Sequence, residues 1–171
     1  RLELLRGNVD TRLRRLAEGE LDAILLACAG LERLGLGSRI TQVLDLELSL
    51  PAVGQGVIGI ECREDDAASR AALVALHHEP SFVRLKAERA FAQTLGGSCH
   101  SPIAAHASLE GGSLVVHGFV GSPDGHEVYR DVERGSPADA EALGRRLAAR
   151  MQAAGAGALL DRLRDEAAAA S

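Results

Sequence analysis

The sequence predicts a protein in two parts: an α/β portion, and after it a small α+β domain in which helices cover a three-stranded antiparallel sheet. Two observations lead to this fold class. Residues 1–76 alternate helical patterns with uninterrupted apolar runs, which are typical of strands buried on both faces of a parallel sheet. After residue 79, three strand-like runs follow one another through short turns, which favours antiparallel pairing.

The first portion opens with a helix. Asn8 is placed to cap it, and Gly19 ends it. The next run, Asp22–Ala29, is apolar almost throughout and does not alternate, which predicts a strand buried on both faces. A short helix over residues 31–34 is expected to follow and to end near Gly35.

A break rich in glycine and proline, residues 51–56, separates these elements from a second predicted strand at Val57–Glu61. A helix over residues 66–76 completes the portion. Helix and strand therefore alternate up to this point, as they do in a sheet with helices on its faces.

The second portion begins with a helix that Pro80 suits as a first-turn residue and that runs to about Thr94. Its expected buried stripe is Phe82, Val83, Ala87, Ala90 and Phe91. The three strands are expected at residues 103–109, 114–120 and 127–132, with turns at residues 110–113 and 122–125. Ser136-Pro137 opens a long helix to about Ala154, and a final helix fades into residues 167–170.

Composition excludes several classes of function. With 171 residues, of which 2% are aromatic, and a net charge of −5, the chain is a poor candidate for stacking on or neutralising nucleic acid. No apolar run approaches the ~20 residues of a membrane span. The three cysteines have no C-x-x-C spacing, which argues against both a disulfide framework and a zinc site. We expect a cytoplasmic protein with reduced thiols.

Cys99 is the most informative single residue. It lies in Leu-Gly-Gly-Ser-Cys-His-Ser-Pro, residues 95–102, a loop sequence in which a thiol is accessible to a cofactor or a reagent. Cys28 falls inside a predicted buried strand and is expected only to pack, whereas Cys62 ends the second strand and its role stays open. His106, His117 and His126 are scattered over the strands without metal-ligand spacing. These histidines therefore do not predict a metal site.

Three arginines near element ends, Arg6, Arg12 and Arg33, are candidate ligands for an anionic small molecule. A guanidinium stays charged and presents a planar fork of donors that matches a carboxylate. The alternative is a solvated helix face, which we prefer for Arg14 and Arg15.

The segment Gly54-Gln55-Gly56 lets a ligand approach the backbone, and Gln55 offers both a donor and an acceptor. No Lys-Ser or Lys-Thr follows it, so it is not a phosphate loop. Taken alone, this segment is a weak indication of a site.

Taken together, these segments resemble the porphobilinogen deaminase (hydroxymethylbilane synthase) family of tetrapyrrole biosynthesis. The resemblance extends in order from Arg6 to about Leu163. The matching stretches are residues 6–13, 22–27, 29–36, 50–56, 59–63, 88–91, the loop around Cys99, and 123–125.

The resemblance implies a protein of three domains, the first two similar to periplasmic binding proteins with a cleft between them. Residues 1–50 then correspond to the latter part of domain 2. Residues 51–78 correspond to the crossover strand and helix that complete domain 1, and residues 79–171 to domain 3. The family's long N-terminal segment has no counterpart in this sequence.

In the family, the loop cysteine carries a dipyrromethane cofactor through a thioether, a role that maps onto Cys99. On this cofactor four porphobilinogen units are joined, each losing ammonia, and the linear tetrapyrrole is finally released by hydrolysis. Arg6, Arg12 and Arg33 match carboxylate-binding arginines, while Gln55 and Gly30 match positions that line the cleft. The family's essential aspartate lies in the missing segment, so the resemblance implies no catalytic residue here, an inactive chain when alone, and a monomer when complete.

The loop also departs from the family pattern, which is usually Leu-Glu-Gly-Gly-Cys: this chain has Gly96 and Ser98 instead. Two other interpretations of the sequence stay open. One is a small-molecule binding module without chemistry, since fold does not fix function. The other is a thiol enzyme in which Cys99 works with a histidine.

Overall fold

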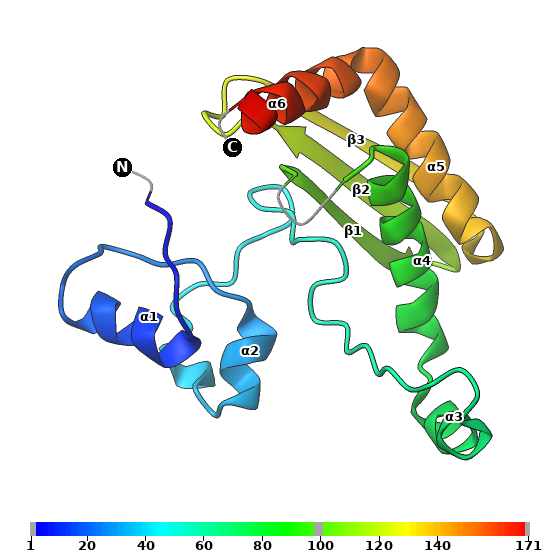
Figure 1. Ribbon diagram of the computed structural model, residues 1–171, viewed down its shortest axis with the longest axis horizontal. Coiled ribbons are helices and arrows are strands. Elements are labelled where there is room, and N and C mark those ends of the chain that lie inside the picture. The colour runs from blue at the N-terminus through cyan, green and yellow to red at the C-terminus, as the bar shows by residue number, and fades with distance from the viewer. Residues whose placement is uncertain (1–2, 98–100, 170–171) are drawn as a thin grey trace. The chain divides into compact units, whose positions relative to one another are not determined.

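The computed structural model describes residues 3–97 and 101–169, which form two compact units (Figure 1). The first unit ends at Leu44 and holds two α-helices. The second begins at Asp45 and holds a sheet together with the remaining helices.

The first unit contains α1 (Val9–Ala17) and α2 (Cys28–Arg33). The side chain of Asn8 accepts a hydrogen bond from the backbone N–H of Thr11 at 2.9 Å, which confirms the predicted cap of α1. The second helix begins earlier than predicted and buries Leu31. Both helices therefore exist where the sequence indicates them.

The two strands predicted for the α/β portion are not found in the described parts of the chain. Asp22–Ala29 is irregular until it enters α2, and Val57–Glu61 is irregular throughout. Several of their apolar side chains are open to solvent, with Leu25 74% exposed and Ile58 66% exposed. A strand buried on both faces needs neighbours for its backbone N–H and C=O groups, and the described residues supply none. The prediction of strands at these two segments is therefore wrong for this chain.

In the second unit, β1 (Ile103–Glu110), β2 (Ser113–Gly121) and β3 (Val128–Gly135) form an antiparallel sheet in the order β1-β2-β3. The turn between β1 and β2 consists of Gly111 and Gly112, whose φ angles are +55° and +80°. Two consecutive positive φ angles are what a type I′ hairpin turn requires. The predicted three-stranded sheet is confirmed.

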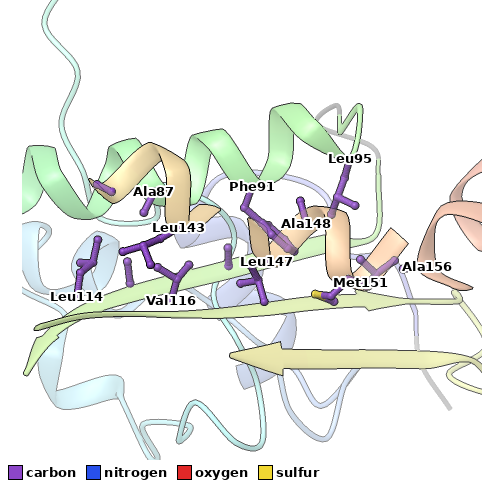
Figure 2. Packing of buried hydrophobic residues seen from close by; sticks show 14 of the residues in the cluster. Ala87, Phe91, Leu95, Leu114, Val116, Leu143, Leu147, Ala148, Met151 and Ala156 are labelled. Atoms are coloured by element: carbon purple, nitrogen blue, oxygen red, sulfur yellow. The ribbon is translucent and has the colours of Figure 1, made fainter. Parts of the chain in front are cut away.

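Helix α3 (Ala67–Leu73) precedes the sheet, and α4 (Glu79–Thr94) and α5 (Ala140–Met151) pack on one face of it (Figures 1 and 2). A kink at Gln152–Ala156 then leads into α6 (Gly157–Ala169). The largest fully buried side chains of the resulting core are Phe91, Leu95, Leu114, Leu143, Leu147, Met151, Val116 and Val120.

One member of the predicted stripe of α4 is placed wrongly. Phe82 is 44% exposed and packs against the ammonium of Lys86, 5.0 Å from its ring centroid, and against the ring of His77 at 5.1 Å. Glu88 instead lies on the buried face. The stripe is thus interrupted by one charged residue.

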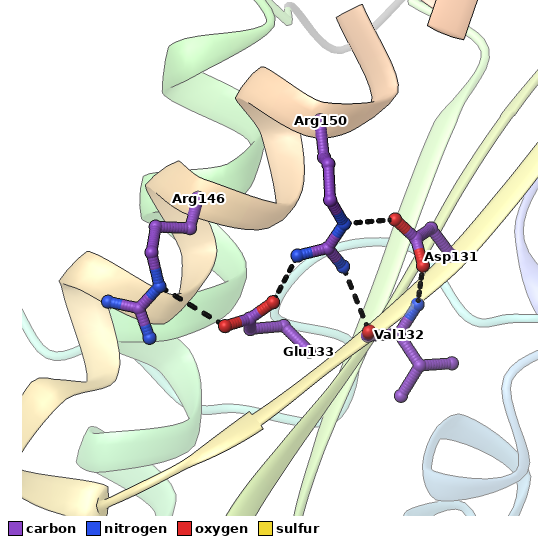
Figure 3. A network of polar contacts seen from close by, with 5 residues as sticks. All are labelled: Asp131, Val132, Glu133, Arg146 and Arg150. Atoms are coloured by element: carbon purple, nitrogen blue, oxygen red, sulfur yellow. Dashed lines mark hydrogen bonds and ion pairs between the residues drawn. The ribbon is translucent and has the colours of Figure 1, made fainter.

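A network of ion pairs joins α5 to β3 (Figure 3). Arg150 donates through Nε to Asp131 at 2.7 Å, through Nη1 to Glu133, and through Nη2 to the carbonyl of Val132 at 2.9 Å. Arg146 donates to the other oxygen of Glu133 at 3.1 Å. The hydrogen bonds from Arg150 hold the pKa of Asp131 and the pKa of Glu133 below their ordinary values.

We expect Arg150→Ala to lower the free energy of unfolding by about 1 kcal/mol at neutral pH. Because the pKa of both carboxyls is lowered in the folded state, their contribution is complete above the unfolded pKa of about 4. It is lost as the pH falls through the lower folded pKa. Urea unfolding at pH 7 and near pH 2 checks this: the difference between the variant and the parent should shrink at low pH. Arg145→Ala, which removes only an exposed pair with Glu141, is the control and should change stability less at both pH values.

Candidate functional site

The glycine-rich break at residues 51–56 forms two consecutive turns within the second unit. The N–H of Gln55 donates to the carbonyl of Ala52 at 3.0 Å, and that of Val57 to Gly54 at 3.0 Å. The φ of Gly54 is +71°, and a Cβ there would lie 3.1 Å from Cδ1 of Leu85 in α4. The segment is therefore pressed against α4 at Gly54.

Gln55 follows at the tip of this segment and is exposed. None of the described residues forms a hydrogen bond with its side-chain amide. Both the donor and the acceptor of that amide are therefore open to solvent.

A cavity of about 720 Å³ lies between this segment, α4 and the beginning of β1. Its lining residues are Ala52, Val53, Leu85, Arg89, Ala92, Gln93, Gly97, Ser101 and Ile103. Most of its wall is apolar, and Arg89 brings a positive charge for which the described chain holds no ion-pair partner. This combination suits a flat apolar ring that carries an acidic substituent.

The predicted attachment residue, Cys99, lies outside the described residues. The described segment that precedes it ends at Gly97. The N–H groups of Gly96 and Gly97 return to the carbonyls of Gln93 and Ala92 at 3.0 and 2.8 Å, which ends α4 in a Schellman motif. Gly96 takes the left-handed position of that motif, with φ +65°. The departure from the family pattern at position 96 thus places glycine where the backbone favours it.

Two side chains from the C-terminal helices complete the end of α4. Gln152 donates to the carbonyl of Thr94 at 3.1 Å, and Arg164 donates to that of Leu95 at 2.7 Å. These carbonyls belong to the last turn of the helix and its cap, where partners within the helix are missing. The positive charge of Arg164 also suits the negative end of the helix dipole.

In the first unit, Arg6 and Arg12 share the N-terminal end of α1. Arg12 donates through Nε to the carbonyl of Gly7 at 2.8 Å, which leaves its two terminal nitrogens without a partner among the described residues. Arg6 is exposed and likewise has no partner there. Two guanidinium forks near one helix N-terminus form a suitable environment for carboxylates.

Arg33 and Gly30 belong to α2 of the same unit. Arg33 is the last residue of the helix, is exposed, and has no ion-pair partner within the described parts of the chain. A Cβ added at Gly30 would meet no atom within 4 Å. Among the described residues, no hydrogen bond or ion pair joins Arg33 or Gly30 to Arg6 or Arg12.

The other cysteines and histidines that the structure describes do not form a second site. Cys28, predicted to lie in a strand, begins α2 and is half-buried, and Cys62 is exposed; both are free thiols. His106 and His117 lie opposite each other on β1 and β2, and burial lowers the pKa of His106. The parts of the chain that the structure describes hold no group of three potential ligands that would suit a metal ion.

Two residues of the site were not predicted, Glu88 and Arg89. They are adjacent on α4, where Glu88 accepts hydrogen bonds from the glycine-rich segment and from β1, and Arg89 lines the cavity. A signal was present in the sequence. Glu88 follows Ala87 on a helix face that is otherwise apolar, and a carboxylate at such a position requires partners.

None of the helices within the described residues is both long and apolar enough to cross a membrane.

The fold combines a three-stranded antiparallel sheet with helices and exposed guanidinium groups, and comparison with known proteins identifies its family. Residues 1–71 match the model described as porphobilinogen deaminase, dipyromethane cofactor binding domain, and residues 82–153 match that of the porphobilinogen deaminase C-terminal domain. The chain is 50% identical over 159 residues to porphobilinogen deaminase of Thiobacillus denitrificans, covering 93% of this chain and 52% of the relative. It is 48% identical over 158 residues to that of Trichlorobacter lovleyi, covering 92% and 51%. The chain belongs to the porphobilinogen deaminase family, and it spans about half the length of these relatives.

Proposed function

We propose that this chain forms the C-terminal part of a hydroxymethylbilane synthase, which joins four porphobilinogen units with loss of ammonia on a dipyrromethane bound to Cys99. One observation carries the proposal. The three arginines that match the family's carboxylate ligands, Arg6, Arg12 and Arg33, keep terminal guanidinium nitrogens that no described residue occupies. Most other arginines of the described chain are engaged, for example Arg150 and Arg164.

The chemistry of the donor set fits the cofactor. Each pyrrole of a dipyrromethane carries an acetate and a propionate, and the chain offers guanidinium forks that bind such groups in a bidentate manner. When bound, the cofactor supplies the pyrrole to which the first porphobilinogen is joined. The arginines hold and orient the acidic substituents, and the amide of Gln55 is available to a pyrrole N–H. The catalytic aspartate is expected in sequence outside these 171 residues.

We also propose that residues 1–50 complete domain 2, that residues 51–78 complete domain 1, and that both resemble periplasmic binding proteins. The exposed apolar side chains of the two predicted strands support this, because such side chains need a cover. Leu25 and Ile58 are the most exposed of them. Strands from outside this sequence would both pair with these segments and bury those side chains. Residues 79–171 are then domain 3.

We propose that the complete protein acts as a cytoplasmic monomer. The free thiols of Cys28 and Cys62 agree with a reducing compartment. Size-exclusion chromatography with light scattering on the complete protein tests the monomer.

A chimera tests the activity. The part of the Thiobacillus denitrificans relative that this chain does not match is fused to residues 1–171, and consumption of porphobilinogen and release of ammonia are measured. We expect activity from the chimera and none from the 171 residues alone. Turnover by the 171 residues alone would contradict the proposal that the catalytic aspartate lies outside this sequence. A chimera that binds porphobilinogen without releasing ammonia would indicate a binding module instead.

Arg12→Ala in the chimera is expected to lower kcat/KM by roughly tenfold to hundredfold, the loss of one charge-assisted hydrogen-bonded pair of about 1.5–3 kcal/mol. Arg14→Ala is the matched control, because Arg14 lies on the same helix and pairs with Glu18 on its exposed side. Steady-state kinetics on both variants gives the comparison. Equal losses of kcat/KM in the two variants would show that Arg12 does not bind the ligand.

A further inference from the structure

Glu88 is a charged residue inside the core of the second unit. It is 7% exposed and lies on the face of α4 that also buries Ala87 and Phe91. No lysine or arginine among the described residues forms a salt bridge with it. A buried carboxylate without a cation is costly unless hydrogen bonds replace its water.

Each oxygen of Glu88 accepts one backbone hydrogen bond from a different segment. The N–H of Gly54 donates to Oε2 at 2.8 Å, and the N–H of Ala107 donates to Oε1 at 2.9 Å. Ala107 belongs to β1, an edge strand of the sheet, so this carboxylate also satisfies a donor at that edge. A single side chain therefore ties the glycine-rich segment, α4 and β1 together.

The hydrogen bond to Glu88 fixes Gly54, the residue that precedes Gln55. The peptide N–H of Gly54 is fixed by Glu88, and Gly54 itself is pressed against Leu85. The backbone direction at Gly54 sets where the exposed amide of Gln55 points. An apolar residue at position 88 would fill the core at a smaller desolvation cost but would leave both N–H groups without a partner.

We propose that Glu88 is a positioning residue: by holding the Gly54 peptide, it presents the Gln55 amide to the pyrrole ligand. This inference rests on the proposed function. In this inference Glu88 does not touch the ligand itself. It acts on ligand binding only by fixing the position of Gln55.

Glu88→Gln is the first variant, because it keeps the volume and replaces one accepting oxygen with an NH₂ group that cannot accept. Glu79→Gln, the same change at an exposed position of the same helix, is the control. Residue-resolved amide hydrogen exchange on the 171-residue chain should show at least tenfold faster exchange at Gly54 or Ala107 in the Glu88 variant. Core amides of β2 should be unchanged. Unchanged exchange at both positions would show that Glu88 does not hold these two N–H groups.

Kinetics in the chimera tests the effect on the ligand. Glu88→Gln should raise the KM for porphobilinogen at least threefold with a smaller change in kcat. The double variant Glu88→Gln/Gln55→Ala should bind no worse than Gln55→Ala alone, since a positioning residue acts only through the residue it positions. If the two substitutions raise KM independently, so that their effects multiply in the double variant, Glu88 does not act through Gln55. This outcome would overturn the positioning role even if exchange at Gly54 changes.

A second variant separates positioning from folding. Glu88→Met has a similar length, removes both acceptors and suits an apolar core. If Glu88→Gln fails to fold, the exchange and kinetic results expected above apply to Glu88→Met. If the chimera with Glu88 intact lacks activity, the proposed function fails and the role toward Gln55 fails with it, whereas the exchange data separately decide whether Glu88 holds the segment.

Discussion

Replacing Gly144 with alanine is expected to be among the most destabilising substitutions in the second unit, at about 3 kcal/mol. Gly144 lies where α5 crosses α4. A Cβ at this position would lie 2.2 Å from the carbonyl oxygen of Ala87 and 2.9 Å from the backbone nitrogen of Phe91. These are backbone atoms of a helix and cannot rotate away, so the two helices must move apart and the core between them must open.

Gly157→Ala is the matched control, because a Cβ there meets its nearest atoms at 3.6 Å, an ordinary contact distance, at the beginning of α6. It should be neutral or slightly stabilising. Urea unfolding of both variants measures the difference. Adding Ala87→Gly to Gly144→Ala should restore nothing, since the nearest atom is a carbonyl oxygen that glycine also has. A loss below 0.5 kcal/mol for Gly144→Ala, or a rescue by Ala87→Gly, would show that the crossing is not limited by the backbone.

Most of the second unit could be predicted because its signals are local. The glycine pair at residues 111–112 specifies a hairpin of defined register, and the run of short strands with turns specifies antiparallel order. Helix ends likewise depend on caps within a few residues, as Asn8 shows for α1 in the first unit. The error at Phe82 has a local cause as well. Near the beginning of α4, Lys86 gives the ring a cation–π contact and His77 gives it an edge-to-face contact, both outside the core.

The strands at residues 22–29 and 57–61 could not be predicted reliably, because an apolar run reports that a segment is to be buried and not what it pairs with. Strand structure requires hydrogen-bonding neighbours, and the described chain provides none at either place. The same apolar runs that misled the secondary-structure prediction are the strongest support for a larger assembly of domains. The prediction was therefore wrong about the conformation in this chain and stays a proposal for the complete protein.

Some residues of the candidate site could be predicted from the sequence, and others could not. The arginines and Gln55 could be proposed from a family resemblance, and the structure adds that their polar groups are available. The role of Glu88 depends on hydrogen bonds to residues 34 positions earlier and 19 positions later in the chain, a juxtaposition that no local pattern expresses. Only a buried charge on an apolar helix face pointed to it.

In the chimera, Cys99→Ala is expected to abolish the covalent adduct and reduce turnover to background. A thioether requires a sulfur at the attachment position, and alanine has none. Mass spectrometry of the denatured chain measures the adduct, and consumption of porphobilinogen measures turnover. Cys62→Ala, which removes an exposed thiol of the same chain, is the matched control and should keep both.

The two readouts together separate the three interpretations of the sequence. A hydroxymethylbilane synthase loses adduct and turnover together in Cys99→Ala. A thiol enzyme loses turnover in the variant but carries no pyrrole adduct even with Cys99 intact. A binding module shows neither property in any form of the chain. An adduct that persists in Cys99→Ala and disappears in Cys62→Ala would contradict the proposed attachment, and would move it to the irregular segment that contains Cys62.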